Sequence, residues 1–595
     1  MQYELKVHIA LTTPVVGFEI VPRVTQSRRV VKENLRFSWY RLEKPEKFFC
    51  CVHPSKAANI QCLCCVALKI PFVLSYYCSL TCFSDTWGVH CLRHALASRN
   101  VNRSLDLDEG FDDIRTCSFF WTAFRHHGQL ARNLLFPRES PTGINIDDYS
   151  LLLVGSSESY IPEIEDIDCF LRLDCVAVDS DGRALGPSNI TYTSQVIAAP
   201  KAHIRRLIEI GCHCGTENDG FKEYKVARTF SVLSYNLLSE IYGNEDAHSH
   251  CPAWALSWEY RRQKLLREIV WYKADILCLQ EVQSDHFENY FAPELAKHGY
   301  SVVYKKKTSG VYTGSQSVSD GCATFFRRDR FTEIKSYEIE FSTALVQFTQ
   351  ELGIQLKGTH MRRLMKDNVA VVVMLELKEN DPVSNTSQSR SSRLICVANT
   401  HVIASKELTD VKLLQVYTLL SILEKDIGDQ RVPLLLCGDL NSLPKSAVYD
   451  LIVKGKVDPS HEELKVDPTG IIQQINLSHK FILVSAYSAL ILAENGGVGF
   501  DELKSCINLE TVEPYFTNYR QRFLGTVDYI FFSATILEVI GLLDLLSTAS
   551  LESFLPSTEW SSDHLAIMAR FHYPRGVQKS SLPVLGEQKR NGSYS

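Results

Sequence analysis

The stretch VPLLLCGDLN, residues 432–441, runs from an apolar segment into a polar end that contains Asp439 and Asn441. Short runs rich in Leu, Ile and Val predict buried strands. Strand ends on one side of packed sheets lie on a common face, so polar side chains beside them should meet in space. The residues at junctions of this kind are Asn236, Glu281, His401, Asp439, Asn441, Asp528, Asp563 and His564.

Around these junctions the chain alternates apolar strands with amphipathic helices. Helical spacing of apolar residues runs through 261–272, 282–298 and 408–425. The segments that predict strands are 229–235, 274–280, 321–328, 369–377, 393–399, 432–439, 525–532 and 564–573. Strands of buried and alternating type, with helices between them, predict an α/β domain with stacked sheets. We place this domain at 228–574, after a linker at 206–227 and before a flexible tail at 575–595.

Residues 1–205 are expected to form a β-rich interaction region. Alternation of polar and apolar residues predicts short strands there, and glycines and a proline mark its end near residue 200. The predicted strands are Glu4–Ile9, Val16–Pro22, Leu35–Arg41, Phe170–Val178 and Ile190–Ile197. The simplest arrangement is a β-sandwich-like module that carries a cysteine-rich segment as an insertion, with a polar linker at about 100–150.

Composition limits the class of protein. A chain of 595 residues is too long for one ordinary core, so about two to four domains are expected. An apolar fraction of 45% rules out disorder over most of the chain. The net charge of −6 argues against a surface coated in basic residues, although a site lined with carboxylates can still act on nucleic acid.

The 19 cysteines are not expected to form disulfides. The N-terminus lacks the basic start, apolar stretch and cleavage site of a signal peptide, and the odd count fits poorly with full pairing. The most apolar window, around Ile60 to Phe83, contains Lys69 and Pro71 and does not predict a membrane span. We therefore expect an intracellular protein with reduced thiols and no membrane partner.

Eight cysteines fall between Cys50 and Cys91, and with nearby histidines they form pairs at zinc-ligand spacing. The segment resembles MYND-type zinc modules, whose Tyr-Cys-Ser-x2-Cys signature occurs at 77–82 and is followed by Trp87 and His90. In that family the first and third pairs share one metal, and the second and fourth share another. The ligand sets that the resemblance implies are Cys51, His53, Cys78 and Cys82, and Cys62, Cys65, His90 and His94. The alternative is a set of free thiols in a β-rich core.

The polar residues at the strand ends indicate hydrolytic metal chemistry. Carboxylates and amides without sulfur ligands select hard cations, so magnesium or manganese is expected. A cation held by carboxylates, with a His–Asp pair beside it, can direct water onto a phosphodiester.

Five dispersed motifs resemble the endonuclease/exonuclease/phosphatase superfamily, in the order of that family. They are the Asn after the first strand, Leu-Gln-Glu-Val, Gly-Asp-Leu-Asn, Val-Asp-Tyr-Ile and Ser-Asp-His, within about 229–573. The resemblance implies a four-layer α/β sandwich. It also implies that Glu281 and Asn236 hold magnesium, with Asp563 nearby.

The same resemblance implies a role for each remaining catalytic residue. Asp439 would align and deprotonate the nucleophile, and Asn441 would contact the scissile phosphate. Asp528 would fix the tautomer of His564, which stabilises the transition state without a covalent intermediate.

Longer segments, such as SYNLLSEIY (234–242) and FTNYRQRFLGTVDYIFFS (516–533), resemble the carbon-catabolite-repressor-type poly(A) deadenylases, and residues 1–100 resemble the plant branch. The resemblance implies that Phe523 stacks on adenine and that Asn518 and His401 contact the substrate. For Phe523, a place in the core is the alternative. The basic runs 305–307, 327–328 and 362–363 are expected to be solvated, with binding of RNA phosphates as the alternative.

The function that the resemblance implies is a magnesium-dependent 3′→5′ exoribonuclease that shortens mRNA poly(A) tails and releases AMP. The chain would be a catalytic subunit of the carbon catabolite repressor–Not deadenylase complex, with its zinc module bound to the second deadenylase subunit. The expected location is the cytoplasm, with P-body and nuclear pools. Two alternatives stay open: another phosphodiesterase of the superfamily, acting on 2′,5′-oligoadenylate or other RNA 3′ ends, and a zinc-module scaffold with an inactive catalytic domain.

Overall fold

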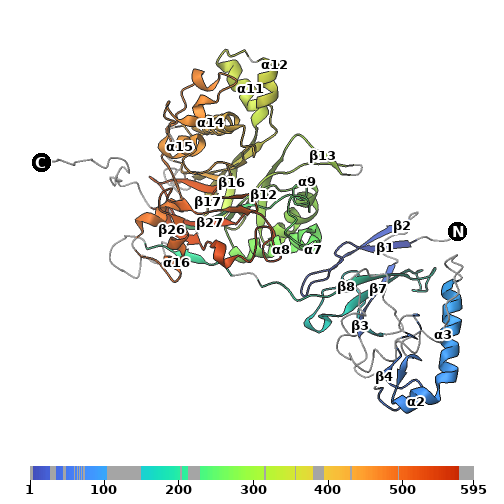
Figure 1. The fold of residues 1–595 in the computed structure, drawn as a ribbon. Helices are drawn as coiled ribbons and strands as arrows, with labels where there is room; N and C mark the ends of the chain where they lie inside the picture. Colours follow the sequence, from blue (N-terminus) through green and yellow to red (C-terminus); the bar gives the residue numbers. More distant parts are fainter. Residues whose placement is uncertain are drawn as a thin grey trace. The chain divides into compact units, whose positions relative to one another are not determined.

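The computed structural model forms two compact units, Met1–Ala199 and Pro200–Ser595 (Figure 1). The described residues are 5–26, 35–43, 49–102, 149–201, 204–211 and 228–574, with gaps at 59, 63, 66–67, 69, 71–73, 314–315, 356, 379–393, 429–431 and 494. Three predicted segments lie largely or wholly outside the described residues: most of the linker at about 100–150, residues 212–227 of the second linker, and the tail 575–595. The flexible tail predicted at 575–595 therefore stays a prediction.

Two mixed sheets form the centre of the second unit. One has the order β12-β15-β11-β10-β27-β26-β9, and the other has the order β16-β17-β18-β19-β25-β20. The first sheet contains β9 (Leu207–Glu209), β10 (Thr229–Asn236), β11 (Ile276–Gln280), β12 (Tyr300–Lys306), β15 (Gly321–Arg327), β26 (Glu538–Leu543) and β27 (Ile567–His572). The second contains β16 (Phe331–Glu340), β17 (Val369–Leu377), β18 (Leu394–His401), β19 (Leu434–Asp439), β20 (Leu483–Ser485) and β25 (Asp528–Ser533).

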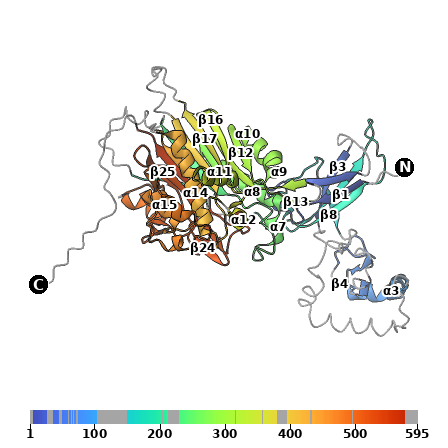
Figure 2. The ribbon, with the colours of Figure 1, turned by 90° about the horizontal axis from the view of Figure 1, so that it is seen from above.

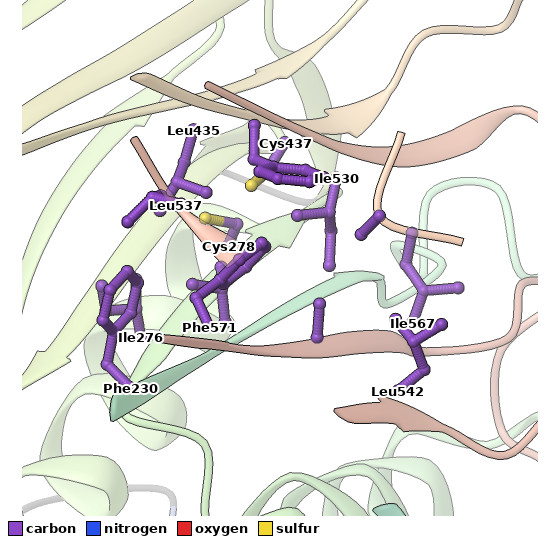
Figure 3. Close-up of a cluster of buried hydrophobic side chains, with 14 of the residues drawn as sticks. Phe230, Ile276, Cys278, Leu435, Cys437, Ile530, Leu537, Leu542, Ile567 and Phe571 are labelled. Atoms are coloured by element: carbon purple, nitrogen blue, oxygen red, sulfur yellow. The ribbon is translucent and has the colours of Figure 1, made fainter. Parts of the chain in front are cut away.

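A continuous apolar core lies between the two sheets. Side chains of β10 and β11 such as Val232 and Ile276 share this core with Leu435, Cys437 and Ile530 of the second sheet (Figure 3). Full burial of one such side chain contributes about 1.5–3 kcal/mol. The residues at alternate positions of these strands face away from this core and pack against helices. Because both faces of each sheet are buried, the strands are apolar at nearly every position.

Helices cover the outer face of each sheet. Leu265 and Ile269 of α8 (Trp258–Tyr272) and Leu295 of α10 (Ala292–Lys297) pack with the outward residues of β10 and β11. The second sheet is covered by α11 (Phe341–Glu351), α12 (Gly358–Leu364), α14 (Thr409–Ile427) and α15 (Ala447–Lys454). Figures 1 and 2 show this layering. The predicted four-layer α/β sandwich is confirmed. Among the described residues, no helix has the length and apolar character that a membrane crossing requires.

The predicted linker at 206–227 is wrong at its beginning. Leu207–Glu209 form β9, which pairs with β26 at the edge of the first sheet. Arg205 is also buried, and its Nε and Nη2 donate to the carbonyl of Asp544 at 2.9 and 2.6 Å. The second unit therefore begins near Pro200 rather than at 228. A strand of only three residues leaves too short a pattern to be recognised in the sequence.

The first unit contains the sheet β6-β3-β7-β8 and the hairpin β1-β2. Their bounds are β1 (Leu5–Ile9), β2 (Pro22–Gln26), β3 (Leu35–Glu43), β6 (Ser150–Gly155), β7 (Phe170–Ala177) and β8 (Asn189–Gln195). Trp39, Leu171 and Val196 are among the residues of their shared core. The predicted strand Val16–Pro22 is wrong, because Gly17 has a φ of 77° and the chain turns there.

The cysteine-rich segment is an insertion between β3 and β6, which pair directly with each other. It contains two strands of two residues, β4 (Ile60–Gln61) and β5 (Tyr76–Tyr77), followed by α2 (Leu80–Asp85) and α3 (Trp87–Asn102). The N-terminal β-rich region with an inserted Cys/His segment thus agrees with the sequence prediction.

Candidate active site

The strand directions bring the polar junctions to one edge of both sheets. In the first sheet β10 and β11 are parallel, so Asn236 and Gln280 end side by side. In the second sheet β18 and β19 are parallel and place His401 beside Asp439. The antiparallel strands β25 and β27 begin at this same edge. Asp528 is therefore paired with Asp439, while Asp563 and His564 lie just before β27.

Asn236 connects the two sheets through its amide. Its Nδ2 donates to Glu281 Oε1 at 3.0 Å and to Asp439 Oδ2 at 3.1 Å. Its Oδ1 accepts from the backbone N–H of Leu238 at 3.0 Å. In this structure Asn236 thus orients two carboxylates, whereas the sequence prediction made it a magnesium ligand.

Glu281 lies just past β11 with a φ of 54°. A left-handed backbone is costly for a residue other than glycine, and such residues gather at functional sites. The Ser239 N–H donates to Glu281 Oε2 at 2.9 Å. Burial, together with the charges of Asp320 and Asp563, raises the pKa of Glu281 to about 7. A cation bound beside Glu281 would offset the repulsion between its carboxylate and those of Asp320 and Asp563.

Asp439 is held on both sides. The Asn441 N–H donates to its Oδ1 at 2.9 Å, and its Oδ2 lies 3.6 Å from Nε2 of both His401 and His564. Burial and the Asp528 charge raise the pKa of Asp439 to about 6. Asn441, with a φ of 47°, donates from Nδ2 to His401 Nε2 at 3.0 Å. The amide of Asn441 and the ring of His401 therefore lie together beside Asp439.

His564 and Asp528 form a buried pair. His564 Nδ1 lies 2.8 Å from Asp528 Oδ2, which also accepts from the Thr517 hydroxyl at 2.6 Å. Burial lowers the pKa of His564, but the charges of Asp528, Asp563 and Asp439 outweigh it and raise that pKa to about 10. The ring is therefore cationic at neutral pH, with Nε2–H directed toward Asp439.

The donor set fits a hard divalent cation. Asp439, Asp528 and His564 form one group whose ligand atoms all lie within 4.8 Å of one another. Oδ1 of Asp528 and Oδ1 of Asp563 are buried and accept no hydrogen bond within the described residues. Carboxylate oxygens buried without a donor are costly unless a positive charge compensates them. The carboxylate oxygens of this set are donors of the type that magnesium prefers, whereas the cationic ring of His564 supplies charge rather than a ligand.

The predicted substrate-binding residues lie next to this group. Asn518 begins β23 (Asn518–Arg520), pairs with His564 as an isolated bridge, and directs Nδ2 to Asp563 Oδ2 at 3.4 Å. Phe523 begins β24 (Phe523–Gly525), the partner strand of a hairpin, and is only partly buried. Phe523 is therefore not enclosed in the main cores, and the residue stays partly exposed.

Three residues of this edge were missed in the sequence. Lys307 is buried and its Nζ lies 2.7 Å from Asp320 Oδ2, while the Tyr242 hydroxyl donates to Asp320 Oδ1 at 3.0 Å. Lys307 had been expected to be solvated with its neighbours. Asp320 precedes β15 and lies outside the five motifs that carry the family resemblance, so it was not among the predicted site residues. Because β15 runs antiparallel to β11, its start lies at the same edge.

The inserted segment holds two further groups of four metal-ligand residues. Cys62, Cys65, His90 and His94 form the group that the sequence predicted, and all four side chains are buried. The other group contains Cys50, His53, Cys78 and Cys82, so Cys50 takes the place predicted for Cys51. Cys50 Sγ lies 3.6 Å from Cys82 Sγ. The two cysteines are adjacent, and spacing alone does not tell which one faces the group.

Comparison with known proteins gives a match over each part of the chain. The Endonuclease/Exonuclease/phosphatase family matches residues 233–564. Carbon catabolite repressor protein 4 homolog 1 of Arabidopsis thaliana is 42% identical over 97% of this chain and 99% of its own length. The CCR4-Not complex 3′-5′-exoribonuclease subunit Ccr4 of Saccharomyces cerevisiae is 34% identical over 63% of this chain and 43% of its own length.

A solved structure of ANGEL2, titled a 2′,3′-cyclic phosphatase, is 28% identical and covers 63% of this chain and 99% of that chain. Its TM-score is 0.46.

Proposed function

Since the chain belongs to the Endonuclease/Exonuclease/phosphatase family and, within it, to the carbon catabolite repressor 4 homologues, we propose that it shortens mRNA poly(A) tails as a magnesium-dependent 3′→5′ exoribonuclease that releases AMP. One observation carries this proposal: the complete polar set at the common sheet edge, in a chain similar to those relatives over nearly its whole length. The carboxylates and imidazole of this set are Glu281, Asp439, Asp528, Asp563 and His564.

Asp439 is the general base in this proposal. Its two oxygens are fixed by the Asn236 amide and the Asn441 N–H, so the carboxylate cannot rotate away from a water beside it. A pKa of about 6 lies closer to neutral pH than that of an ordinary aspartate, which makes Asp439 a better proton acceptor. Asn441 would contact the scissile phosphate through its amide.

His564 supplies positive charge to the transition state. Asp528 holds Nδ1, which leaves Nε2–H on the side of Asp439, where a reacting phosphate would bind in this proposal. Because its pKa is about 10, the ring keeps its proton at neutral pH and can stabilise the charge that develops on the phosphate oxygens.

Glu281 and Asp563 would hold the divalent cation, and Asn236 would orient Glu281 for it. When bound, the cation supplies Lewis-acid charge against the phosphate oxygens. The raised pKa of Glu281, caused by burial and by Asp320 and Asp563, is the property that a bound cation would reverse.

The test uses the purified full chain with magnesium and a 5′-labelled RNA that ends in an A-tail. Stepwise shortening that stops near the tail junction is expected, and AMP should be the product. A matched RNA with a 3′ tail of another base should be shortened much more slowly. Equal rates on both tails, or preferred cleavage of 2′,5′-oligoadenylate, would favour another phosphodiesterase of the family. No hydrolysis of any of these substrates would favour an inactive scaffold.

For the first unit we propose that its two Cys/His groups hold structural zinc and that this unit docks the chain on a deadenylase complex. Relatives are named as subunits of the CCR4-Not complex, which supports this partner. The zinc segment would bind the second deadenylase subunit, and the complex would act in the cytoplasm, with P-body and nuclear pools. Deletion of 49–102 should abolish pull-down of that subunit and spare RNA hydrolysis. Imaging of the tagged chain checks the location.

A further inference from the structure

We propose that Arg520 is a further substrate-binding residue, whose guanidinium takes an anionic phosphate oxygen at the 3′ end of the RNA. This inference rests on the proposed function, because it assigns a phosphate of the same substrate. It assigns a role to a residue that lies in the quoted segment 516–533 but had none in the sequence analysis.

The hairpin β23–β24 sets the position of Arg520. Arg520 is paired with Phe523 across the hairpin, and Asn518 is paired with Gly525. Asn518 also forms a bridge with His564, so this hairpin is attached directly to the catalytic edge. Arg520 therefore lies two residues from a strand position that contacts the catalytic histidine.

The guanidinium contacts three groups that belong to the site. Its Nε donates to Asn518 Oδ1 at 3.1 Å and lies 3.6 Å from Asp563 Oδ2. Its central carbon lies 5.8 Å from the centre of the Phe523 ring. One cationic group thus lies between the proposed cation ligand and the proposed base-stacking ring. A terminal nucleotide stacked on Phe523 would bring its phosphate toward this position.

Arg520 keeps free donors for a ligand. Its side chain is 48% exposed, whereas Asp563 is 5% exposed. Within the described residues, only Nε has a hydrogen-bond partner, and the two terminal nitrogens have none. A guanidinium is a small rigid plane, so those nitrogens stay near Asn518 and Asp563, and their fork matches two phosphate oxygens.

The balance of charge favours an anionic ligand over a structural role. The edge carries the carboxylates of Glu281, Asp439, Asp528 and Asp563. Of the nearby cations, His564 is paired with Asp528, and Lys307 is buried and paired with Asp320. An RNA phosphate that approaches this edge needs a compensating charge at the rim. A half-exposed ion pair such as Arg520–Asp563 adds little stability, so fold stability gives a weak reason for the arginine.

The chain offers a matched control in the turn of the same hairpin. Arg522 is also exposed. Among the described residues, its side chain forms no hydrogen bond with Asn518, no ion pair with Asp563 and no cation–π contact with Phe523. We therefore compare Arg520→Gln with Arg522→Gln in the full chain, on A-tailed RNA with saturating magnesium. KM, kcat, equilibrium binding of the RNA and thermal unfolding are measured for each variant at several salt concentrations.

Arg520→Gln should raise KM and Kd for the RNA by about 10-fold or more, because a charge-assisted contact to phosphate is lost. Its kcat should change much less. The slope of log Kd against log salt should fall by about 0.7, the value for one phosphate contact with a single strand. Arg520→Lys should keep the salt slope of the wild type, because it keeps the charge. Arg522→Gln should match the wild type in all four measurements.

The experiment distinguishes failure of the Arg520 inference from failure of the proposed function. If the wild type shortens the RNA and Arg520→Gln behaves as Arg522→Gln does, the inference is wrong and the proposed function stands. If the wild type neither binds nor shortens the RNA, the proposed function fails and the inference falls with it. Should Arg520→Gln unfold, Arg520→Lys decides: an unchanged salt slope with a moderately raised KM supports phosphate binding, and wild-type KM together with a changed slope contradicts it.

Discussion

The catalytic edge and the inserted Cys/His segment both gather buried polar side chains, but they fix them by different means. At the catalytic edge the side chains are attached to strands of a seven-stranded and a six-stranded sheet, with an apolar core between them. In the inserted segment the strands β4 and β5 have two residues each, and cysteines form much of the core themselves. Packing positions the first set, whereas the second set would depend on the zinc that we propose it holds.

Removal of metal gives the strongest test of this difference between the two regions. A strong zinc chelator should unfold the segment 49–102 in the full chain, because binding energy in a structural zinc site is folding energy, of the order of 10 kcal/mol per site. Hydrogen exchange should then show loss of amide protection in that segment and unchanged protection in 228–574. Retained protection in 49–102 after zinc has left would mean that packing, not metal, holds it.

Zinc content can also test the choice between the adjacent cysteines. Cys50→Ser should lower the metal content of the chain by one zinc, while Cys51→Ser should leave it unchanged, because only Cys50 belongs to the group of four. Loss of one zinc in Cys51→Ser alone would restore the ligand set predicted from the sequence.

At the catalytic edge, loss of one group should remove activity without loss of fold. Asp439→Asn should lower kcat by about 10²- to 10⁴-fold, the contribution of a positioned general base. Thermal unfolding and zinc content should not change, since the surrounding cores are untouched. Wild-type kcat in this variant would contradict the assignment of Asp439.

The next largest expected effect is on stability and concerns the buried ion pair Lys307–Asp320. Lys307→Met leaves Asp320 buried without its cation and should destabilise the second unit by about 3–5 kcal/mol. Denaturant unfolding, followed by hydrogen exchange of amides in the second unit, measures this loss of stability. Lys306→Met is the matched control, because Lys306 is exposed whereas Lys307 is buried. Similar losses in the two variants would show that the Lys307–Asp320 pair has no special role.

The smallest effect concerns Glu513, a carboxyl buried away from the catalytic edge. The hydroxyls of Tyr449 and Ser485 donate to it at 2.7 and 2.9 Å, and burial still raises its pKa to about 8. The unfolded chain loses this proton near pH 4.3. Folding therefore takes up a proton between about pH 5 and 8, and the stability of the second unit should fall as pH rises through that window.

Glu513→Gln should remove this part of the pH dependence and become relatively more stable than the wild type as pH rises toward 8. Unfolding by denaturant at pH 5.5, 7 and 8 measures the difference. Glu510→Gln, at an exposed position three residues away, should show the pH dependence of the wild type. Parallel curves for wild type and Glu513→Gln would mean that Glu513 is ionised in the folded chain.

Sequence reasoning located the catalytic edge because its residues follow or begin long apolar strands. Asn236, Glu281, Asp439 and His564 are brought together as the strand directions require, although their individual roles stay predictions. The same reasoning passed over Asp320, which precedes an antiparallel strand as Asp563 does but lies outside the five motifs that carry the family resemblance. Strand direction is a tertiary property, so the sequence gives no sign that this residue shares the edge.

Where the elements are short, local pattern was not enough. Leu207–Glu209 has too few residues to show a period, and its place in the sheet comes from pairing with β26 more than 300 residues later. Cys50 and Cys51 are chemically identical neighbours, and it is the contact of Cys50 with Cys82 that shows which of them joins His53. In both cases a long-range contact supplies the missing information.

The edge position of β9 also affects how this protein can be divided. A fragment that begins at 228 would lack β9 and the buried Arg205. It would uncover the edge of β26 that faces β9 at Gly541–Leu543, while the opposite edge stays paired with β27. An uncovered strand edge is a template for pairing with another copy. Such a nuclease fragment would keep every catalytic residue and yet self-associate edge to edge, so its measured activity would depend on its own concentration.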